Sequence, residues 1–273
     1  MRIVNFRHQG RMRLGALKGD EITLFSMQDG LMSFMRRGIT PQPTSERVKL
    51  DEVKLLAPYY TPGKIVCVGR NYAAHAAELD HEVPDEPLLF VKLSTAVIGH
   101  GETIRWSESL TTQVDWEGEL AVLIGKTAKN VSEEDAMEYV FGYTVGNDVS
   151  ARDLQSNDSQ WIRAKGLDTF CPLGPMVLTA DEIDDPHDLT VKTTVNGEEM
   201  QNGHTGLMIY KIPTLISYCS RAFTLEPGDI IMTGTPAGVG KGMKPPRFLK
   251  DGDTVTVSID GIGELSNPCA VES

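Results

Sequence analysis

The ten residues Asp115–Ile124, which read DWEGELAVLI, constrain what this chain can fold into more than any other segment. Acidic residues alternate with other residues in the first half, and the second half is an unbroken apolar run. Because successive side chains of a strand point to opposite faces, a strand here would place Asp115, Glu117 and Glu119 on one face. Neighbours on that face lie only about 7 Å apart, which is close for like charges. The pattern therefore predicts a buried strand that carries crowded carboxylates.

Crowded carboxylates beside a buried segment repel one another and lose solvation unless a cation joins them. Hard divalent cations such as Mg²⁺ or Mn²⁺ prefer oxygen ligands, so either ion would suit this strand. An edge strand whose acids face water explains the same segment about as well. The ten residues alone leave both interpretations open.

The glycine and proline content favours a turn-rich β protein over a helical bundle, with 26 Gly and 15 Pro among 273 residues. The first 57 residues are too few to bury much surface alone. We therefore predict a mixed, mainly β fold in which a small N-terminal α+β unit, residues 1–57, packs on a larger catalytic domain, residues 58–273.

Turn residues and hydrophobic patterns locate the expected elements. The expected strands are Arg2–Phe6, Arg13–Leu17, Glu21–Phe25, Ile65–Val68, Leu88–Lys92, Leu120–Ile124, Met176–Leu178, Thr190–Val195, Ile230–Thr233 and Thr254–Ile259. The expected helices are Met27–Arg37, Ala73–Leu79, Ser132–Glu138 and Pro213–Phe223. The polar, proline-bearing Thr40–Glu46 is expected to be a loop, and Asn196-Gly197 a hairpin turn.

Charge and cysteine usage narrow the class of protein. A net charge of −12 without a basic stripe argues against nucleic-acid binding. The four cysteines are widely separated and form no CxxC pair, as expected of free thiols in a reducing compartment. Neither a signal peptide nor an apolar run of membrane-spanning length is present in this sequence. We therefore expect a soluble, cytoplasmic protein.

Three further segments carry candidate chemistry. The segment Gly234–Lys241 resembles a phosphate-binding loop, but its glycines do not have the spacing of that motif. The backbone N–H groups of the segment and Thr235 could hold a carboxylate, or the segment is only a tight turn. His75 and Glu78 share one face of an expected helix, where Glu78 could orient His75 as a base, although a structural pair is commoner. Asp148 could supply a third carboxylate, and Lys165 is by default a surface lysine.

Five motifs together are more specific than any one of them. They are Gly69-Arg70-Asn71-Tyr72-x-x-His75, Asp115-x-Glu117-x-Glu119-Leu120, Asn147–Asp153, Lys165-x-x-Asp168-x-Phe170 and Gly228–Gly240. In this order, and over about residues 64–269, they resemble the fumarylacetoacetate hydrolase family, and its smaller bacterial members more than the full-length eukaryotic hydrolase. The resemblance raises the metal interpretation well above the solvated-strand one.

The resemblance implies a β-roll domain, usually homodimeric, with one Mg²⁺ or Mn²⁺ held by three carboxylates. These ligands fall on Glu117, Glu119 and Asp148. By the same resemblance, His75 with Glu78 is the base dyad and Lys165 the lysine beside the metal and the developing oxyanion. Substrate contacts are expected at Arg70, Arg152, Gln155 and Thr235. Asp115 is not a usual ligand, and we expect it to support the ligands instead.

This site implies an enzyme that cleaves a carbon–carbon bond of a small 2-oxo acid through a metal-bound enolate. Our first expectation is hydrolysis of a 3-acylpyruvate, such as fumarylpyruvate or acetylpyruvate, to pyruvate and a carboxylic acid. Decarboxylation of oxaloacetate comes next, and isomerisation or decarboxylation of an unsaturated 2-hydroxydioate third. A non-catalytic metabolite-binding protein is the alternative of a different class, against which His75, Glu78 and Lys165 speak.

Overall fold

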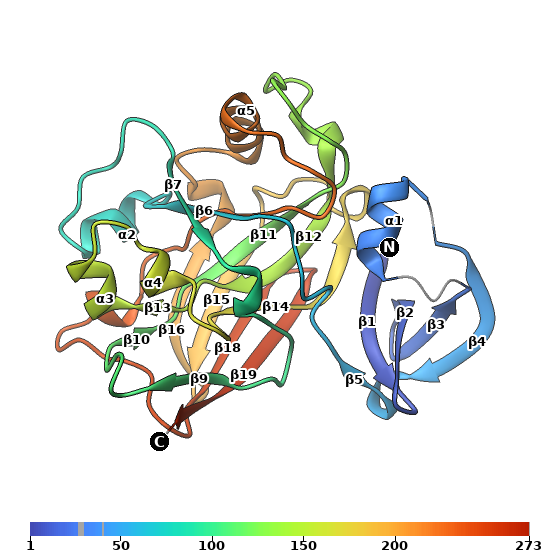
Figure 1. Ribbon diagram of the computed structural model, residues 1–273, viewed down its shortest axis with the longest axis horizontal. Helices are drawn as coiled ribbons and strands as arrows, with labels where there is room; N and C mark the ends of the chain where they lie inside the picture. The colour runs from blue at the N-terminus through green and yellow to red at the C-terminus, as the bar shows by residue number, and fades with distance from the viewer. Residues whose placement is uncertain (27–29, 40, 273) are drawn as a thin grey trace.

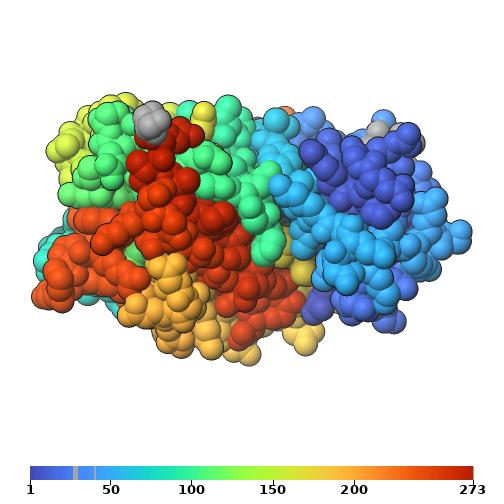
Figure 2. All heavy atoms as spheres, turned by 90° about the horizontal axis from the view of Figure 1, so that it is seen from below, coloured from blue at the N-terminus to red at the C-terminus, as the bar shows by residue number. Residues whose placement is uncertain are grey.

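The computed structural model describes residues 1–26, 30–39 and 41–272. The N-terminal residues gather at one end of an elongated molecule, and the rest of the chain forms a larger body (Figures 1 and 2). The two parts share one sheet, because β1 (Arg2–His8) pairs antiparallel with β14 (Cys171–Thr179). The expected mixed, mainly β fold is confirmed, whereas the domain boundary at residue 57 stays a prediction.

Two large sheets organise the described residues. The first has the order β4 (Pro43–Lys49), β3 (Glu21–Phe25), β2 (Arg11–Lys18), β1, β14, β12 (Val140–Asn147), β11 (Gly118–Ile124), β17 (Ile230–Met232), β6 (Ile65–Gly69), β7 (Leu88–Lys92), with β5 (Lys54–Leu55) on β1 and β8 (Val97–Ile98) on β14. The second has the order β16 (Glu198–His204), β15 (Thr190–Val195), β18 (Thr254–Ile259), β19 (Gly263–Glu272), β9 (Ile104–Ser107). A small pair, β10 (Val114–Asp115) with β13 (Ser150–Ala151), lies beside them.

Helices are short and lie around the sheets (Figure 1). They are α1 (Leu31–Arg37), α2 (Ala73–Glu78), α3 (Arg152–Asn157), α4 (Ile162–Lys165) and α5 (Ile212–Ala222). Single 3₁₀ turns are η1 (Leu50–Glu52), η2 (Ser94–Ala96), η3 (Ala136–Tyr139), η4 (Ala180–Glu182), η5 (Thr205–Leu207) and η6 (Gly240–Gly242). Among the described residues, no helix combines the length and apolar character needed to cross a bilayer.

Strand β11 explains the unbroken apolar run of the sequence. It lies between β12 and β17, and every one of its residues is buried. Leu120 and Val122 belong to a hydrophobic cluster that α5 covers, while Ala121 and Leu123 belong to a second cluster. Because alternate residues face opposite sides of a strand, β11 is apolar on both faces and carries polar side chains only where it begins.

The structure corrects three expected elements. Residues Pro43–Lys49 form the edge strand β4 rather than a loop, since pairing with β3 outweighs the polar composition and a proline is tolerated at the start of an edge strand. The helix expected over Ser132–Glu138 is replaced by a single 3₁₀ turn, η3, before β12. Ser132 Oγ accepts the Asp135 N–H at 3.2 Å, as a helix cap would, but the chain is extended again from Val140. Helix α1 begins at Leu31, and residues 27–29 lie outside the described part.

A fourth correction concerns Asp115. The expected continuous strand is broken at Trp116-Glu117, so that Asp115 ends β10 and Glu119 lies in β11. The side chain of Asp115 binds Arg152 and is not part of the cluster that Glu117 and Glu119 form with Asp148. The other expected strands of both units, helices α2 and α5 and the hairpin turn at Asn196-Gly197 are confirmed.

We expect Leu123→Ala to lower the free energy of unfolding by about 2–5 kcal/mol, because Leu123 is 0% exposed in the centre of β11. The matched control is Leu207→Ala, since Leu207 is 66% exposed; it should change stability by less than about 0.5 kcal/mol. Urea unfolding followed by circular dichroism measures both. Equal stabilities of the two variants would contradict a core centred on this strand.

Candidate metal centre and active site

Three buried carboxylates meet at the start of β11. Ligand oxygens of Glu117, Glu119 and Asp148 all lie within 4.8 Å of one another. The register of β11 and β12 produces this meeting, because Gly118 pairs with Asn147 and the next N–H, of Asp148, donates to Glu117 O at 2.8 Å. The structure thus brings together the three residues expected as metal ligands, although their role as ligands stays a prediction.

Buried cations balance two of these carboxylates. Lys165 Nζ lies 2.8 Å from both Glu117 Oε2 and Asp148 Oδ2. Arg152 Nη1 contacts Glu117 Oε1 at 2.6 Å, and Lys92 Nζ lies 2.7 Å from Asp148 Oδ1. Burial works to lower the pKa of Lys165, but the attraction of Asp148 and Glu117 outweighs it and holds that pKa above its ordinary value.

Glu119 has no cation of its own among the described residues. Its Oε2 accepts the Gly234 N–H at 2.8 Å. Burial, followed by the charges of Asp148 and Glu117, raises the pKa of Glu119 well above its usual value. Of the three carboxylates, Glu119 is therefore the one without a positive charge beside it among the described residues.

The donor set fits a hard divalent cation. Asp148 Oδ1 is buried and accepts no hydrogen bond, because the ammonium of Lys92 beside it donates to the carbonyls of Val149, Lys165 and Phe170 at 3.0, 2.6 and 2.8 Å. Carboxylate oxygens are the ligands that Mg²⁺ and Mn²⁺ prefer. Such an ion would give Asp148 Oδ1, which has an ion pair but no hydrogen bond, a further partner, and it would supply the counter-charge that Glu119 lacks.

Asp115 supports the site from behind, as expected. Its Oδ2 accepts from Arg152 Nε at 2.8 Å and from the Lys241 N–H at 3.0 Å, while its Oδ1 accepts from the N–H of Trp116 and of Gly240. One buried carboxylate thus fixes both the guanidinium that contacts Glu117 and the loop that follows β17.

The expected dyad is assembled on α2. His75 Nδ1 lies 2.7 Å from Glu78 Oε1, and His75 is 5% exposed. Glu78 Oε2 also accepts the Gly238 N–H at 2.8 Å, which holds α2 against the loop after β17. A neutral imidazole that donates from Nδ1 to this carboxylate has its acceptor at Nε2, which is the arrangement that a general base requires.

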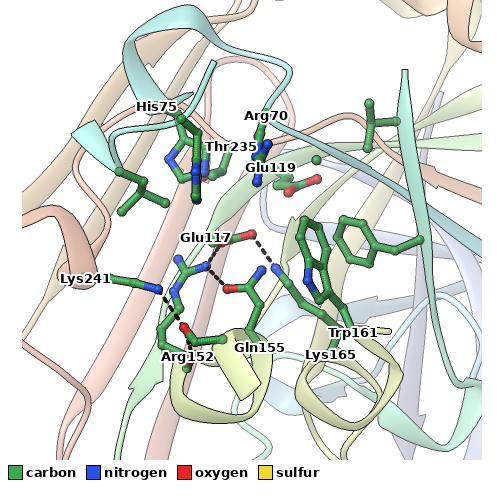
Figure 3. Close-up of a pocket in the computed structure, with 16 residues that line it drawn as sticks. Arg70, His75, Glu117, Glu119, Arg152, Gln155, Trp161, Lys165, Thr235 and Lys241 are labelled. Atoms are coloured by element: carbon green, nitrogen blue, oxygen red, sulfur yellow. Dashed lines mark hydrogen bonds and ion pairs between the residues drawn. The ribbon is translucent and has the colours of Figure 1, made fainter. Parts of the chain in front are cut away.

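A cavity of about 340 Å³ connects the dyad to the carboxylates. Figure 3 shows His75 and Arg70 on one side of it and Arg152, Gln155 and Lys165 on the other. All four expected substrate contacts line this cavity: Arg70, Arg152, Gln155 and Thr235. Their roles stay predictions, and the Thr235 hydroxyl already donates to Gly118 O at 2.9 Å and accepts from Gln201 Nε2 at 2.7 Å.

Several residues of the site were not expected from the sequence. Lys92 ends a strand that was expected, but nothing in the sequence distinguished it from a surface lysine. Phe90 and Trp161 form one wall, with ring centroids 5.3 Å apart, and Lys165 Nζ lies 4.9 Å from the centre of the Phe90 ring. Lys241, in the glycine-rich loop, also lines the cavity.

Comparison with known proteins agrees with this geometry. The model described as "Fumarylacetoacetate (FAA) hydrolase C-terminal" matches residues 64–270. The chain belongs to the fumarylacetoacetate hydrolase family. A second model, "Rv2993c-like, N-terminal", matches residues 1–58. The resemblance that the five motifs carried is therefore confirmed.

Relatives of this family member span several activities. Oxaloacetate tautomerase YisK of Bacillus subtilis is 50% identical over 221 residues, 80% of this chain and 73% of that protein. Protein Rv2993c of Mycobacterium tuberculosis is 44% identical over 267 residues, 94% of this chain and 97% of that protein. The solved structure of a fumarylacetoacetate hydrolase from Exiguobacterium antarcticum has a TM-score of 0.92 and 43% identity, and the match covers 100% of both chains.

Two further solved structures mark the range of the family's chemistry. A 2-hydroxyhepta-2,4-diene-1,7-dioate isomerase from Mycobacterium marinum has a TM-score of 0.85 at 38% identity, over 100% of this chain and 99% of that one. A maleylpyruvate hydrolase from Sphingobium sp. SYK-6 has a TM-score of 0.80 at 30% identity, over 100% of both. The family thus includes enzymes that isomerise and enzymes that hydrolyse small organic acids, which agrees in part with the activities that the resemblance implied.

We expect Glu119→Gln to lower the affinity for Mn²⁺ by at least about 100-fold, since the change removes one of three anionic ligands and even indirect partners of a metal contribute 10- to 100-fold. Folding should persist, because burial and two neighbouring carboxylates already raise the pKa of Glu119 and glutamine resembles its neutral form. Calorimetric titration measures the affinity. Glu78→Gln, outside the cluster, should keep it; unchanged Mn²⁺ binding by Glu119→Gln would refute the ligand assignment.

Proposed function

We propose that this protein is a Mg²⁺- or Mn²⁺-dependent enzyme that enolises small 2-oxo acids, and that keto–enol tautomerisation of oxaloacetate is its first activity. The observation that supports this most is the joining of an imidazole base, a lysine and a three-carboxylate cluster by one cavity. Relatives support the substrate, among them oxaloacetate tautomerases of Bacillus subtilis and Xenopus laevis, each 50% identical to the matched region of this chain. They move tautomerisation ahead of the acylpyruvate hydrolysis that we expected first.

The chemistry divides among the residues of the cavity. A divalent ion held by Glu117, Glu119 and Asp148 would act as a Lewis acid toward the keto group. His75, which lines the cavity and contacts Glu78 through Nδ1, removes a proton from C3 of the substrate through Nε2, and Glu78 stabilises the imidazolium that forms. Lys165 places positive charge near the oxygen that becomes anionic. The imidazolium of His75 then returns the proton to that oxygen, which completes the enol, and the reverse steps restore the ketone.

Hydrolysis of a 3-acylpyruvate is the second candidate, because the same His75 nitrogen can deprotonate a water molecule. The likeness to a maleylpyruvate hydrolase supports it. Attack of that water on the distal carbonyl breaks the carbon–carbon bond and leaves a carboxylic acid and the enolate of pyruvate. Decarboxylation of oxaloacetate reaches the same enolate by loss of CO₂ and needs no base. Isomerisation of an unsaturated 2-hydroxydioate stays the third activity.

The oligomeric state and the location of the protein are also proposals. We propose a homodimer in the cytoplasm, acting on a small-molecule substrate. The family resemblance supports the dimer and the substrate, and the four widely separated, free cysteines support a reducing compartment. Binding of metabolite without turnover explains the site less well, because neither metal binding nor the charge balance of the carboxylates requires the His75–Glu78 dyad.

We expect His75→Ala to lower tautomerisation of oxaloacetate and hydrolysis of acetylpyruvate by at least about 100-fold, the usual contribution of a general base. Oxaloacetate decarboxylation should fall less, because it requires no proton abstraction. Loss of enol absorbance measures tautomerisation, and release of pyruvate measures hydrolysis and decarboxylation. Each is followed with and without Mg²⁺. His204→Ala, which removes a half-exposed histidine outside the cavity, is the control and should retain all rates. An equal loss of all three activities in His75→Ala would exclude the base role.

We expect Lys165→Met to lower all three activities together, because each builds negative charge on the same keto oxygen. The measurement is kcat/KM for oxaloacetate and for acetylpyruvate, in the wild type and in the variant. Mn²⁺ affinity, measured alongside, should not fall, since the lysine competes with a cation for Glu117 and Asp148. Loss of one activity alone would contradict a shared oxyanion.

A further inference from the structure

Lys241 is held in the cavity without a carboxylate partner. Its backbone N–H donates to Asp115 Oδ2 at 3.0 Å, which fixes the loop that carries it. Its ammonium donates to Ser156 Oγ on α3 at 3.0 Å, and within the described parts of the chain it forms no ion pair. An ammonium has three N–H donors, so this contact leaves two of them for a ligand. Figure 3 shows the side chain reaching toward Arg152.

Arg152 offers a second donor that nothing satisfies. The residue is 1% exposed; its Nε binds Asp115 and its Nη1 binds Glu117 and Gln155. Its Nη2 is buried and has no hydrogen-bond partner. Leaving a buried, charged donor unpaired is costly, so a position of this kind normally has an acceptor in the working state of a protein.

The two cations also repel each other. Burial and then the charge of Arg152 lower the pKa of Lys241 from its ordinary value. Asp115 opposes this only in part, since its oxygens accept four other hydrogen bonds from the backbone and from Arg152. An anion placed between Lys241 and Arg152 would offset both their repulsion and their burial.

We propose that Lys241 and Arg152 Nη2 form a subsite for the distal carboxylate of a 2-oxo dicarboxylate, and that Lys241 is the residue that selects such substrates over monocarboxylates. The subsite adjoins the metal centre, because the other amino group of the same guanidinium contacts Glu117. This inference rests on the proposed function, in which the 2-oxo carboxylate end of the substrate is held at the carboxylate cluster. It assigns the opposite end.

The test compares two stable ligands that differ only at the distal position. Malate has a carboxylate where 2-hydroxybutyrate has a methyl group, and each can chelate an ion through its hydroxyl and its other carboxylate. Calorimetry on the Mn²⁺-loaded protein should show tighter binding of malate. Lys241→Met should weaken malate by about 10- to 100-fold, the usual effect of removing a charge-assisted hydrogen bond, and leave 2-hydroxybutyrate within about twofold.

The matched control is Lys244→Met, an exposed lysine three residues further along the same loop and outside the cavity. It should retain the preference for malate, and Lys241→Arg should restore most of it. Equal binding of the two ligands by the wild type, or an equal change of both in Lys241→Met, would overturn the subsite. A lysine-dependent malate preference without turnover of oxaloacetate would keep the subsite and reject the proposed function. Turnover of oxaloacetate without that preference would reject the subsite and keep the proposed function.

Discussion

Charge balance around three buried carboxylates is the constraint on which the rest of this structure depends. Glu117, Glu119 and Asp148 are almost fully buried, and isolated buried charges are costly. Lys165, Lys92 and Arg152 compensate two of them, and each of these cations comes from a different segment of the chain. Removing one partner of such a buried pair typically costs about 3–5 kcal/mol, because the other charge is left buried and unpaired. The pairs therefore tie α3, α4 and β7 to the carboxylates at the start of β11.

The backbone at the start of β11 makes this cluster possible. Gly118 lies between the two glutamates, and a Cβ there would come within 2.3 Å of Thr193 Oγ1 and 2.9 Å of Val257 Cγ1. Only glycine allows β11 to approach the second sheet so closely. That approach, together with the pairing of Gly118 with Asn147, sets Glu117 beside Asp148. Apolar packing on both faces of β11 then fixes the strand that presents them.

The sequence predicted those parts of the site that depend on local patterns. Alternation placed Glu117 and Glu119 together, and helical spacing placed His75 on the same face as Glu78; both arrangements are present. It did not place Asp115, because the break in the strand directly after this residue cannot be seen in an alternating pattern. Asp148 and Lys165 were assigned only through the family resemblance, since the pairing of distant strands brings them to the cluster.

Residues whose roles arise from long-range contacts could not be predicted. Lys92 and Lys241 look like surface lysines in the sequence. In the structure Lys92 is buried and Lys241 lines the cavity. The same limit explains strand β4, where pairing with β3 overrides a polar, proline-bearing sequence.

The account depends most on the cluster being a metal site. Crystals soaked in Mn²⁺ and measured near the manganese absorption edge test this directly, because anomalous scattering locates the ion without any assumption about the reaction. We predict a single strong peak within coordination distance of one oxygen each from Glu117, Glu119 and Asp148. A fully soaked crystal with no peak there, or with its main peak elsewhere on the chain, would contradict the account.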